Sequence, residues 1–463
     1  MRLERLLRLG TEDRVAAPDP LLASLREAAY LDRASAHVAA GRSPKAPEFA
    51  VKAALGLRQF VWIDRAHRLL REIETQARFD GPPPAPAEGF RRALRRIDSA
   101  ASTADLVAGL FGTVRPHVGR IYARALPRLD PIVHAHLVPI VREGIAAARE
   151  ERAIGRRLLA RAESRPTPAF RRDLGRLWRR RGEGRPVRGA GLWSPVDRVP
   201  RAARPAGADR GAPGALIEIP LDSFRTRDGI GLFFHNNANA EYGTLEIVAR
   251  SSYEHPGMPE AFHLAVARHA SDEARHALLM ERWAARFGVP YGSRGLATTA
   301  YDLVYEFGPC PRGGRRELLW RLLIKSTVQE GIALDDFAMK IRQRRWLGQR
   351  DLAAVFAHLY ADEIFHCANG LRWARFLCGG DERRVRRERE RARACYERRI
   401  RDRRLGFVGR RPRAAAAEEA RLIEVDRRHR SPFRLRIDRR GRRLAGFTGA
   451  DVAQAVRWGD VEA

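Results

Sequence analysis

Two short stretches decide the fold: Ser271-Asp-Glu-Ala-Arg-His276 and Ala361-Asp-Glu-Ile-Phe-His366. In each of them a glutamate stands three residues before a histidine, so both side chains lie on one face of a helix and can share a metal ion. Chance predicts about 1.6 acid-x-x-His pairs in a chain of this composition, whereas five are present. Only these two have a second acid directly before the first, which chance produces about 0.2 times. The two stretches therefore predict a metal site built on helices.

Each of these motifs has a glutamate upstream at nearly the same distance. Glu241 lies 32 residues before Glu273, and Glu330 lies 33 residues before Glu363. Two ligands at the middle of antiparallel helices need about 33 residues between them, because each limb has about 14–15 residues, or about 22 Å, and a short turn joins the limbs. The repeated order of Glu and then Glu-x-x-His is the ligand order of a di-metal carboxylate site in a four-helix bundle.

The sequence thus predicts four carboxylates and two imidazoles around two divalent ions, with positions left open for oxygen or a substrate. These predicted metal ligands and catalytic groups are Glu241, Glu273, His276, Glu330, Glu363 and His366. Glu246, about one helical turn past Glu241, is the alternative first ligand. Glu260 is excluded because it lies about 20 Å along the same helix from Glu273. A buried ion-pair network without metal is the other interpretation, and the cost of burying four carboxylates without a cation disfavours it.

Asp272 and Asp362 each stand four residues before one of the ligand histidines. We expect each of them to accept the ring N–H of the histidine on the opposite helix pair and so to fix the orientation of that ring. Tyr242, Tyr360 and Trp373 could relay electrons to such a site, but aromatic residues in the core of a bundle more often simply pack.

Apolar residues at three- and four-residue spacing predict an all-α fold. The second half is expected to form a bundle over 226–380, with a long crossover at 288–313 between its second and third helices. Its helices are predicted at 232–253, 259–287, 314–345 and 348–378. The other expected segments are a helical domain at 1–180, interrupted by a proline-rich run at 81–89, a Gly/Pro/Arg-rich linker at 181–225 and an Arg-rich extension at 381–463 that begins with one more helix.

The charge of the chain is strongly basic. Lys and Arg number 87 against 56 Asp and Glu, which gives a net charge of +31, and only four of the basic residues are lysines. The preference for arginine is typical of a GC-rich genome. The excess over acids favours polyanions and predicts weak, non-specific nucleic-acid binding, and a solvated basic surface with no particular ligand is the alternative. In the extension after residue 380, aromatic residues punctuate the arginines. We expect these aromatic residues to pack on their own domain and to leave the arginines in water, rather than to bind single-stranded nucleic acid.

The remaining composition predicts a cytoplasmic protein. The four cysteines form no CxxC pair and no zinc-type spacing, which is typical of a reduced compartment. The first residues lack the apolar core of a secretion signal, and no apolar run reaches the roughly 18–20 residues that span a bilayer.

Three segments resemble a known group of proteins. They are NAEYGTLEIVARSSYEHPGMPEAFHLAVARHASDEARHALLMERWAARFGVPYG at 239–292, VQEGIALDD at 328–336 and YADEIFHCANGLRWARFLC at 360–378. Together they look like an uncharacterised bacterial ferritin-like domain family, distantly similar to the tRNA-hydroxylase, rubrerythrin and bacterioferritin branches. The resemblance covers about 230–380 and implies a di-iron bundle with ligands at the six positions above. Asn239 departs from it, because the family is expected to have histidine two residues before the first glutamate.

A di-metal site of this kind predicts oxygen chemistry. The first hypothesis is an oxygen-dependent oxygenase or oxidase with two iron ions, or with an Fe/Mn or Mn/Mn pair, which uses molecular oxygen as co-substrate and requires an electron donor. Its organic substrate would be unidentified and, given the basic charge, anionic or RNA. The alternatives are a ferroxidase or peroxide scavenger, and a nucleic-acid-binding protein with a structural metal.

The N-terminal half shows four short matches to the second half, in the same order. They place Glu27, Asp64 with His67, and Glu143 at ligand positions, and Arg176 where a histidine is expected. Arginine cannot bind a metal ion. The matches therefore predict a degenerate second copy of the bundle in which Arg176 neutralises the remaining acids. An ordinary helical domain is the alternative, and the long spacing from Asp64 to Glu143 favours it.

Overall fold

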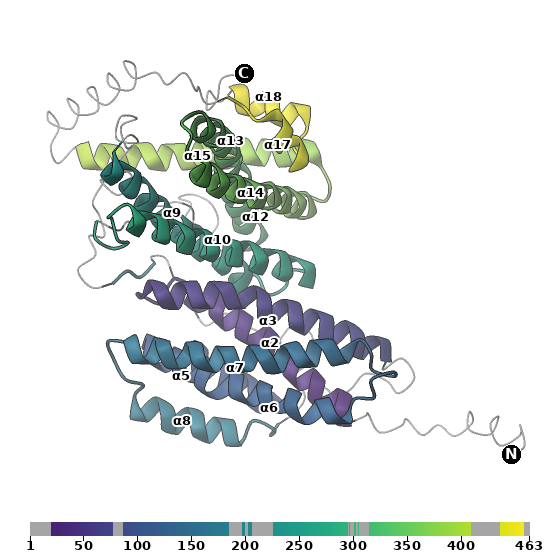
Figure 1. Cartoon of the computed structure of the whole chain (residues 1–463). Helices are drawn as coiled ribbons and strands as arrows, with labels where there is room; N and C mark the ends of the chain where they lie inside the picture. The colour runs from purple at the N-terminus through teal and green to yellow at the C-terminus, as the bar shows by residue number, and fades with distance from the viewer. Residues whose placement is uncertain are drawn as a thin grey trace, which may run out of the picture. The chain divides into compact units, whose positions relative to one another are not determined.

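The computed structural model describes residues 20–76, 87–184, 197–199, 202–205, 226–294, 296, 301, 304, 314–408 and 436–457. Every regular element among them is a helix (Figure 1), which confirms the predicted all-α class. None of the described helices is long and apolar enough to cross a membrane. Most of the predicted linker at 181–225 and of the proline-rich run at 81–89 lies outside the described residues, although a helix already begins at Glu88.

The chain divides into two compact units. The first comprises Met1–Val38 and Val61–Val196, and the second comprises Ala39–Phe60 and Asp197–Ala463. Residues 39–60 thus belong with the second unit, which the prediction of a separate domain over 1–180 did not anticipate.

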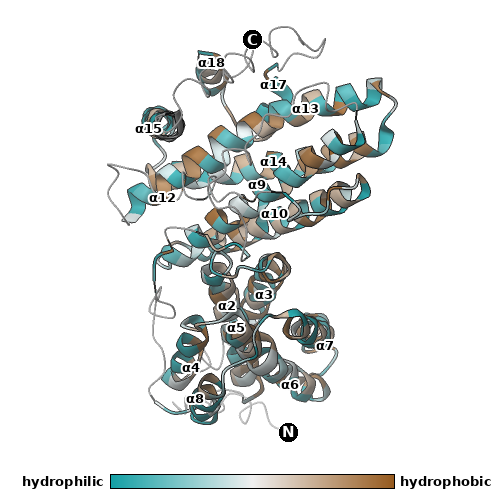
Figure 2. Cartoon of the chain, turned by 90° about the vertical axis from the view of Figure 1, so that its left-hand side faces the viewer, coloured by the Kyte–Doolittle hydropathy of each residue, from teal (hydrophilic) through white to brown (hydrophobic). Residues whose placement is uncertain are grey.

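Two helix pairs form the core of the second unit, α9 with α10 and α13 with α14. A five-residue turn joins the first pair and a three-residue turn joins the second. These short turns make each pair antiparallel, as Figures 1 and 2 show. The bounds of three helices follow the predicted ranges closely: α9 is Arg227–Glu254, α10 is Glu260–Arg286 and α14 is Arg350–Leu377. α13 (Glu330–Trp346) is the last part of the helix predicted at 314–345.

The third long helix of this bundle changes its pitch in the middle. It begins as α12 (Gly314–Leu322), continues as the π-helical segment η7 (Leu323–Gln329) and becomes α13 at Glu330. The N–H of Glu330 donates to the carbonyl of Lys325, five residues earlier. In an α-helix, residues five apart lie about 140° apart, whereas a π-turn brings them close to one side. The π segment therefore aligns Lys325 and Glu330.

Apolar side chains fill the bundle on either side of its polar middle. One buried cluster includes Ala238 of α9, Met280 of α10, Phe337 of α13 and Leu359 of α14. Close approach of the chain also shapes this region, because a Cβ on Gly56 of α3 (Phe49–Gln76) would lie 2.7 Å from the Cβ of Ala274. Ala274 lies between Glu273 and His276, so the α3 segment of this unit packs against the first Glu-x-x-His motif.

The C-terminal extension packs on the bundle through α15 (Glu382–Val408), α17 (Arg439–Leu444) and α18 (Gly449–Arg457). Phe447 is buried against Leu334 and Leu371, as expected for its aromatic residues. The expectation that its arginines lie in water is wrong for three of those that the structure describes, because Arg389, Arg393 and Arg442 are buried. Arg389 donates to Asp451 at 2.6 Å and Arg442 donates to Asp335 at 2.6 Å, and all four side chains are buried. The side chains of Phe407, Phe433 and Trp458 lie outside the described residues.

The first unit has a buried charged cluster at its centre, with one residue from each of four helices. These helices, which Figure 2 shows nearly end-on, are α2 (Pro20–Arg42), α3 (Phe49–Gln76), α6 (Arg115–Ala125) and α7 (Leu137–Arg161). Arg65 donates to Asp32 at 2.7 Å, and Arg115 lies 2.6 Å from Asp32 and 2.7 Å from Glu151. All four side chains are fully buried. Two guanidinium groups thus balance two carboxylates without any metal.

This cluster is not the one that the sequence matches predicted. Glu27 lies 2.8 Å from His117, and Arg68 bridges the half-exposed Asp64 and Glu143. Arg176 is 68% exposed and pairs with Asp173, so its proposed role in a core is wrong.

The two units share one local feature, a π-helical segment. The π-helical segment η2 (Leu110–Val114) ends directly before Arg115, as η7 ends directly before Glu330. Duplication itself stays a prediction.

Replacing Arg115 by methionine should destabilise the first unit strongly, because Asp32 and Glu151 would each lose a buried counter-charge. Removing one partner from a buried ion pair typically costs about 3–5 kcal/mol. Arg68→Met is the matched control, since Arg68 is 38% exposed and an exposed pair contributes at most about 1 kcal/mol. Urea denaturation measures both, and equal losses in the two variants would contradict the assignment of Arg115 to the core.

Candidate metal centre

The six residues predicted as ligands lie in the middle of the helix bundle of the second unit. Glu241 comes from α9, Glu273 and His276 from α10, Glu330 from the first turn of α13, and Glu363 and His366 from α14. Five of these six residues are buried, and the Glu241 side chain is 12% exposed. Ala238, Met280, Leu334 and Leu359 lie about one helical turn from the ligands and form apolar surroundings.

The structure groups these side chains into two sets that could each hold a metal ion. Within each set the candidate ligand atoms lie within 4.8 Å of one another. One set is Glu241, Glu273 and His276, which we call the one-histidine position. The other is His269, Glu273, Glu330 and His366, which we call the two-histidine position. Glu273 belongs to both, so the two positions are adjacent.

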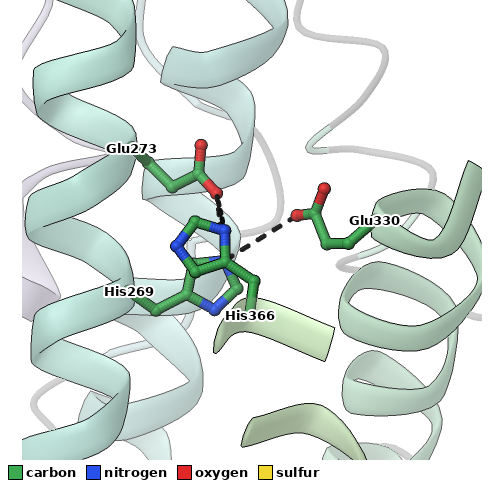
Figure 3. Close-up of side chains that lie close together, drawn as sticks. All are labelled: His269, Glu273, Glu330 and His366. Carbon is green, nitrogen blue, oxygen red and sulfur yellow. Dashed lines mark hydrogen bonds and ion pairs between the residues drawn. The ribbon is translucent and has the colours of Figure 1, made fainter. Parts of the chain in front are cut away.

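The two-histidine position contains a residue that the sequence interpretation missed (Figure 3). His269 stands one helical turn before Glu273, and its Nε2 lies 3.0 Å from Glu273 Oε1 and 3.7 Å from Glu330 Oε1. Its ring stacks on that of His366, with centroids 3.7 Å apart and planes 14° apart. His366 Nδ1 in turn lies 3.3 Å from Glu273 Oε1. Two imidazoles and two carboxylates therefore face one point.

The one-histidine position has its ligand atoms slightly farther apart. His276 Nδ1 lies 3.6 Å from Glu273 Oε2 and 4.0 Å from Glu241 Oε2. Glu363 lies between the two positions, because one of its oxygens is 3.9 Å from His276 Nδ1 and the other is 3.1 Å from His366 Nδ1. Glu273 and Glu363 are thus placed to bridge two ions.

The two aspartates of the motifs contact the outer nitrogens of the ligand histidines across the bundle. His276 Nε2 lies 3.0 Å from Asp362 Oδ2, and His366 Nε2 lies 3.5 Å from Asp272 Oδ2. Arg275 donates to both aspartates, at 2.7 Å and 2.9 Å, and holds them in place. The contact with Asp362 directs Nδ1 of His276 toward the carboxylates and fixes that ring, whereas Asp272 faces the outer nitrogen of His366 only as an ion pair.

Asp362→Asn should weaken metal binding by about 10–100-fold, because an amide cannot keep the charge-assisted contact that orients His276 and raises its basicity. Asp351→Asn is the control, since Asp351 is exposed in the first turn of the same helix. Competition with a chromogenic chelator measures the two affinities, and an unchanged affinity in Asp362→Asn would show that the aspartate does not support the site.

Lys325 is a second group that the sequence interpretation missed. Its Nζ lies 3.2 Å from Glu330 Oε1, and its side chain is 12% exposed. Burial opposes the charged form, yet the charges of Glu330, Glu273 and Glu241 together raise the pKa of Lys325 above its usual value. The site therefore contains one fixed positive charge.

The electrostatics of the cluster divide the carboxylates into two kinds. Burial favours the neutral form of all of them. The hydrogen bond from His269 and the nearby rings of His276 and His366 nevertheless hold the pKa of Glu273 well below its usual value, and Lys325 lowers that of Glu330 to about 2. Burial and the neighbouring carboxylates raise the pKa values of Glu241 and Glu363 well above the usual range.

The histidines respond in the same way to burial and to the acids around them. Burial lowers the pKa of each ring. Asp362 and Glu273 outweigh this effect at His276 and raise its pKa to about 10, and Glu273 and Glu330 raise that of His269. The pKa of His366 is lowered by burial and by the charge of His269. The neighbouring acids thus stabilise the protonated forms of His269 and His276.

Buried ligand atoms without partners show that the site fits metal ions. Glu273 Oε2, His276 Nδ1 and Glu330 Oε1 are buried and have no hydrogen-bond partner. Lys325 contacts the last of them only as an ion pair. Such atoms cost free energy unless something satisfies them. Carboxylate oxygens with imidazole nitrogens are donors that suit iron and manganese.

The remaining predicted candidates lie elsewhere. Glu246, the alternative first ligand, is fully buried but binds Lys52 at 2.6 Å and Arg204 at 2.7 Å. Glu260 begins α10, far from the cluster along the helix. The three candidate relay residues have packing or hydrogen-bonding partners outside the ligand set. Tyr242 donates to Glu281, Tyr360 donates to Asp438, and Trp373 packs on Phe262.

Comparisons with known proteins place the site within a family match. The sequence matches the family described as "Protein of unknown function (DUF455)" over residues 180–423, which includes all the ligand candidates. No curated protein and no solved structure matches the chain.

Proposed function

The chain belongs to the DUF455 family of proteins of unknown function, and we propose that it is an oxygen-dependent oxidoreductase. In this proposal the second bundle is ferritin-like and holds two iron ions, or iron with manganese, and the protein oxidises an organic substrate. One observation carries the proposal. Two buried sets of carboxylates and imidazoles from four helices share Glu273, which is the arrangement of di-metal carboxylate proteins.

The residues around the ions would divide the work between them. Glu273 and Glu363 would help to hold both ions, and Glu241 and Glu330 would each help to hold one of them. Asp272 and Asp362 would keep the histidine rings oriented. Two such ions supply the binding and reduction of molecular oxygen. The apolar side chains one turn away would keep bulk water from the site and so strengthen its electrostatic interactions.

Lys325 holds a proton beside Glu330 and adds positive charge to the site. Together with the net charge of +31, this supports an anionic substrate. The chain also has more helices than those of the bundle. A minimal iron-storage subunit does not need them, and this supports an organic substrate.

Anaerobic loading with Fe(II) followed by exposure to oxygen tests the proposal. We expect about two iron ions per chain, oxygen uptake and a new near-ultraviolet absorbance. Glu273→Ala should abolish all three, because Glu273 belongs to both ligand sets, whereas Glu260→Ala should keep them. Protein that retains no metal would refute the proposal, and protein that retains metal without taking up oxygen would favour a structural role. Continued oxidation of a large excess of Fe(II) would instead identify a ferroxidase.

A further inference from the structure

We propose that the two metal positions are chemically different, and that His269 makes the two-histidine position select iron over manganese while the one-histidine position accepts manganese. This inference rests on the proposed function, because it requires that the cluster binds two ions. It goes further by assigning a different metal preference to each position and a residue to that difference.

The donor atoms of the two positions differ by one imidazole. Glu273 and Glu363 face both positions, and each position has one further carboxylate, Glu241 or Glu330. The one-histidine position then has only His276, whereas the two-histidine position has both His269 and His366. His269 is buried, and its Nε2 faces Glu273 and Glu330 at 3.0 Å and 3.7 Å. It is therefore placed as a ligand and not as an outer contact.

Donor type distinguishes the two metals. Imidazole nitrogen suits iron, whereas carboxylate oxygen suits manganese, and affinities for a given site rise from Mn²⁺ to Fe²⁺. A second imidazole therefore raises the ratio of Fe(II) affinity to Mn(II) affinity at the position that contains it. The position with one imidazole has a narrower preference and takes up manganese when manganese is in excess.

Charge alone cannot produce this discrimination. Lys325 lies 3.2 Å from Glu330, so its ammonium repels any cation in the two-histidine position. Both metals are divalent, and the repulsion is therefore the same for each. Lys325 lowers the affinity of this position for both metals but leaves their ratio unchanged. Variants of Lys325 and His269 should thus have different effects.

Competition between the two metals tests the inference. Metal-free full-length protein is loaded anaerobically with a fixed amount of Fe(II) and increasing Mn(II), and the bound metals are counted by elemental analysis and by the electron paramagnetic resonance of Mn(II). In the wild-type protein we expect iron to be displaced in two steps. A plateau with one iron and one manganese per chain should separate them.

His269→Gln should remove the plateau, because an amide oxygen replaces the second imidazole. The ratio of Mn(II) to Fe(II) that displaces the last iron should fall to the ratio that displaces the first, because each position then holds one imidazole. His263→Gln is the matched control, since His263 is a buried histidine of the same helix that contacts Ser252 at 2.8 Å. It should keep both steps. Lys325→Met should tighten binding of both metals and leave the displacement ratio as in the wild type.

Single-step displacement in the wild-type protein, or a plateau that persists in His269→Gln, would overturn the inference while leaving the proposed function intact. Loss of the plateau in His263→Gln to the same extent would also overturn it, because the effect would then not be specific to His269. Protein that binds neither metal under any condition would instead refute the proposed function.

Discussion

Glu273→Gln should empty both metal positions at once. Glu273 is the one residue that belongs to both ligand sets among the described residues, and a pKa well below its usual value keeps its carboxylate available as an anion. Glutamine has nearly the same shape but cannot carry the bridging charge. Loss of an outer contact to a ligand already costs about 10–100-fold in affinity, so loss of this ligand should cost more than about 100-fold at each position.

Elemental analysis after loading with Fe(II) or Mn(II) measures this effect. Glu260→Gln, on the same helix, is the control and should bind as much metal as the wild-type protein. Glu241→Gln provides the contrast, because Glu241 belongs to the one-histidine position alone. It should lose one ion and keep the other. A Glu273→Gln protein that still binds two ions would show that Glu273 does not bridge them.

Metal binding should release up to four protons per chain. The pKa values of Glu241 and Glu363 are raised by burial and by neighbouring acids, and those of His269 and His276 are raised by their carboxylate partners despite burial. These four groups bind protons where the metal ions would bind. Ligands must lose such protons before they coordinate a metal.

The direction of the pH dependence follows from these raised pKa values. Below its raised pKa each group keeps its proton, so metal binding weakens as the pH falls. The overall constant for two ions should fall by up to about four powers of ten per pH unit while all four groups are protonated. The dependence should become shallower as the pH rises toward about 10, where His276 loses its proton. Calorimetric titration with Mn(II) in two buffers of different ionisation enthalpy counts the protons, and heats that do not depend on the buffer would contradict this expectation.

The long helices could be predicted well because their apolar spacing is regular. The bounds of α10 and α14 differ from the predicted ranges by only a few residues. The grouping of residues 39–60 with the second unit could not be predicted. It depends on close packing such as that of Gly56 on Ala274, and a glycine in a helical pattern does not indicate its partner.

The convergence of the six candidate ligands could be predicted from spacing, whereas their surroundings could not. His269 had a usable signal, because a histidine four residues before Glu273 lies on the same helical face. Lys325 had none. Five residues from Glu330, it would lie on a different face of an α-helix, and only the π segment aligns the two. The sequence left Glu246 open as the alternative to Glu241, because it does not show that Lys52 and Arg204 bind Glu246.

The arginine cluster of the first unit has a consequence for how this protein matures. Asp32 and Glu151 receive their counter-charges from Arg65 and Arg115, which are covalent parts of the same chain. Guanidinium groups stay charged at any physiological pH and no chelator can remove them. Under the proposed function, the acids of the second unit would depend on ions that the cell must deliver. The first unit can therefore complete its core during synthesis, whereas the second would reach full stability only after metal delivery.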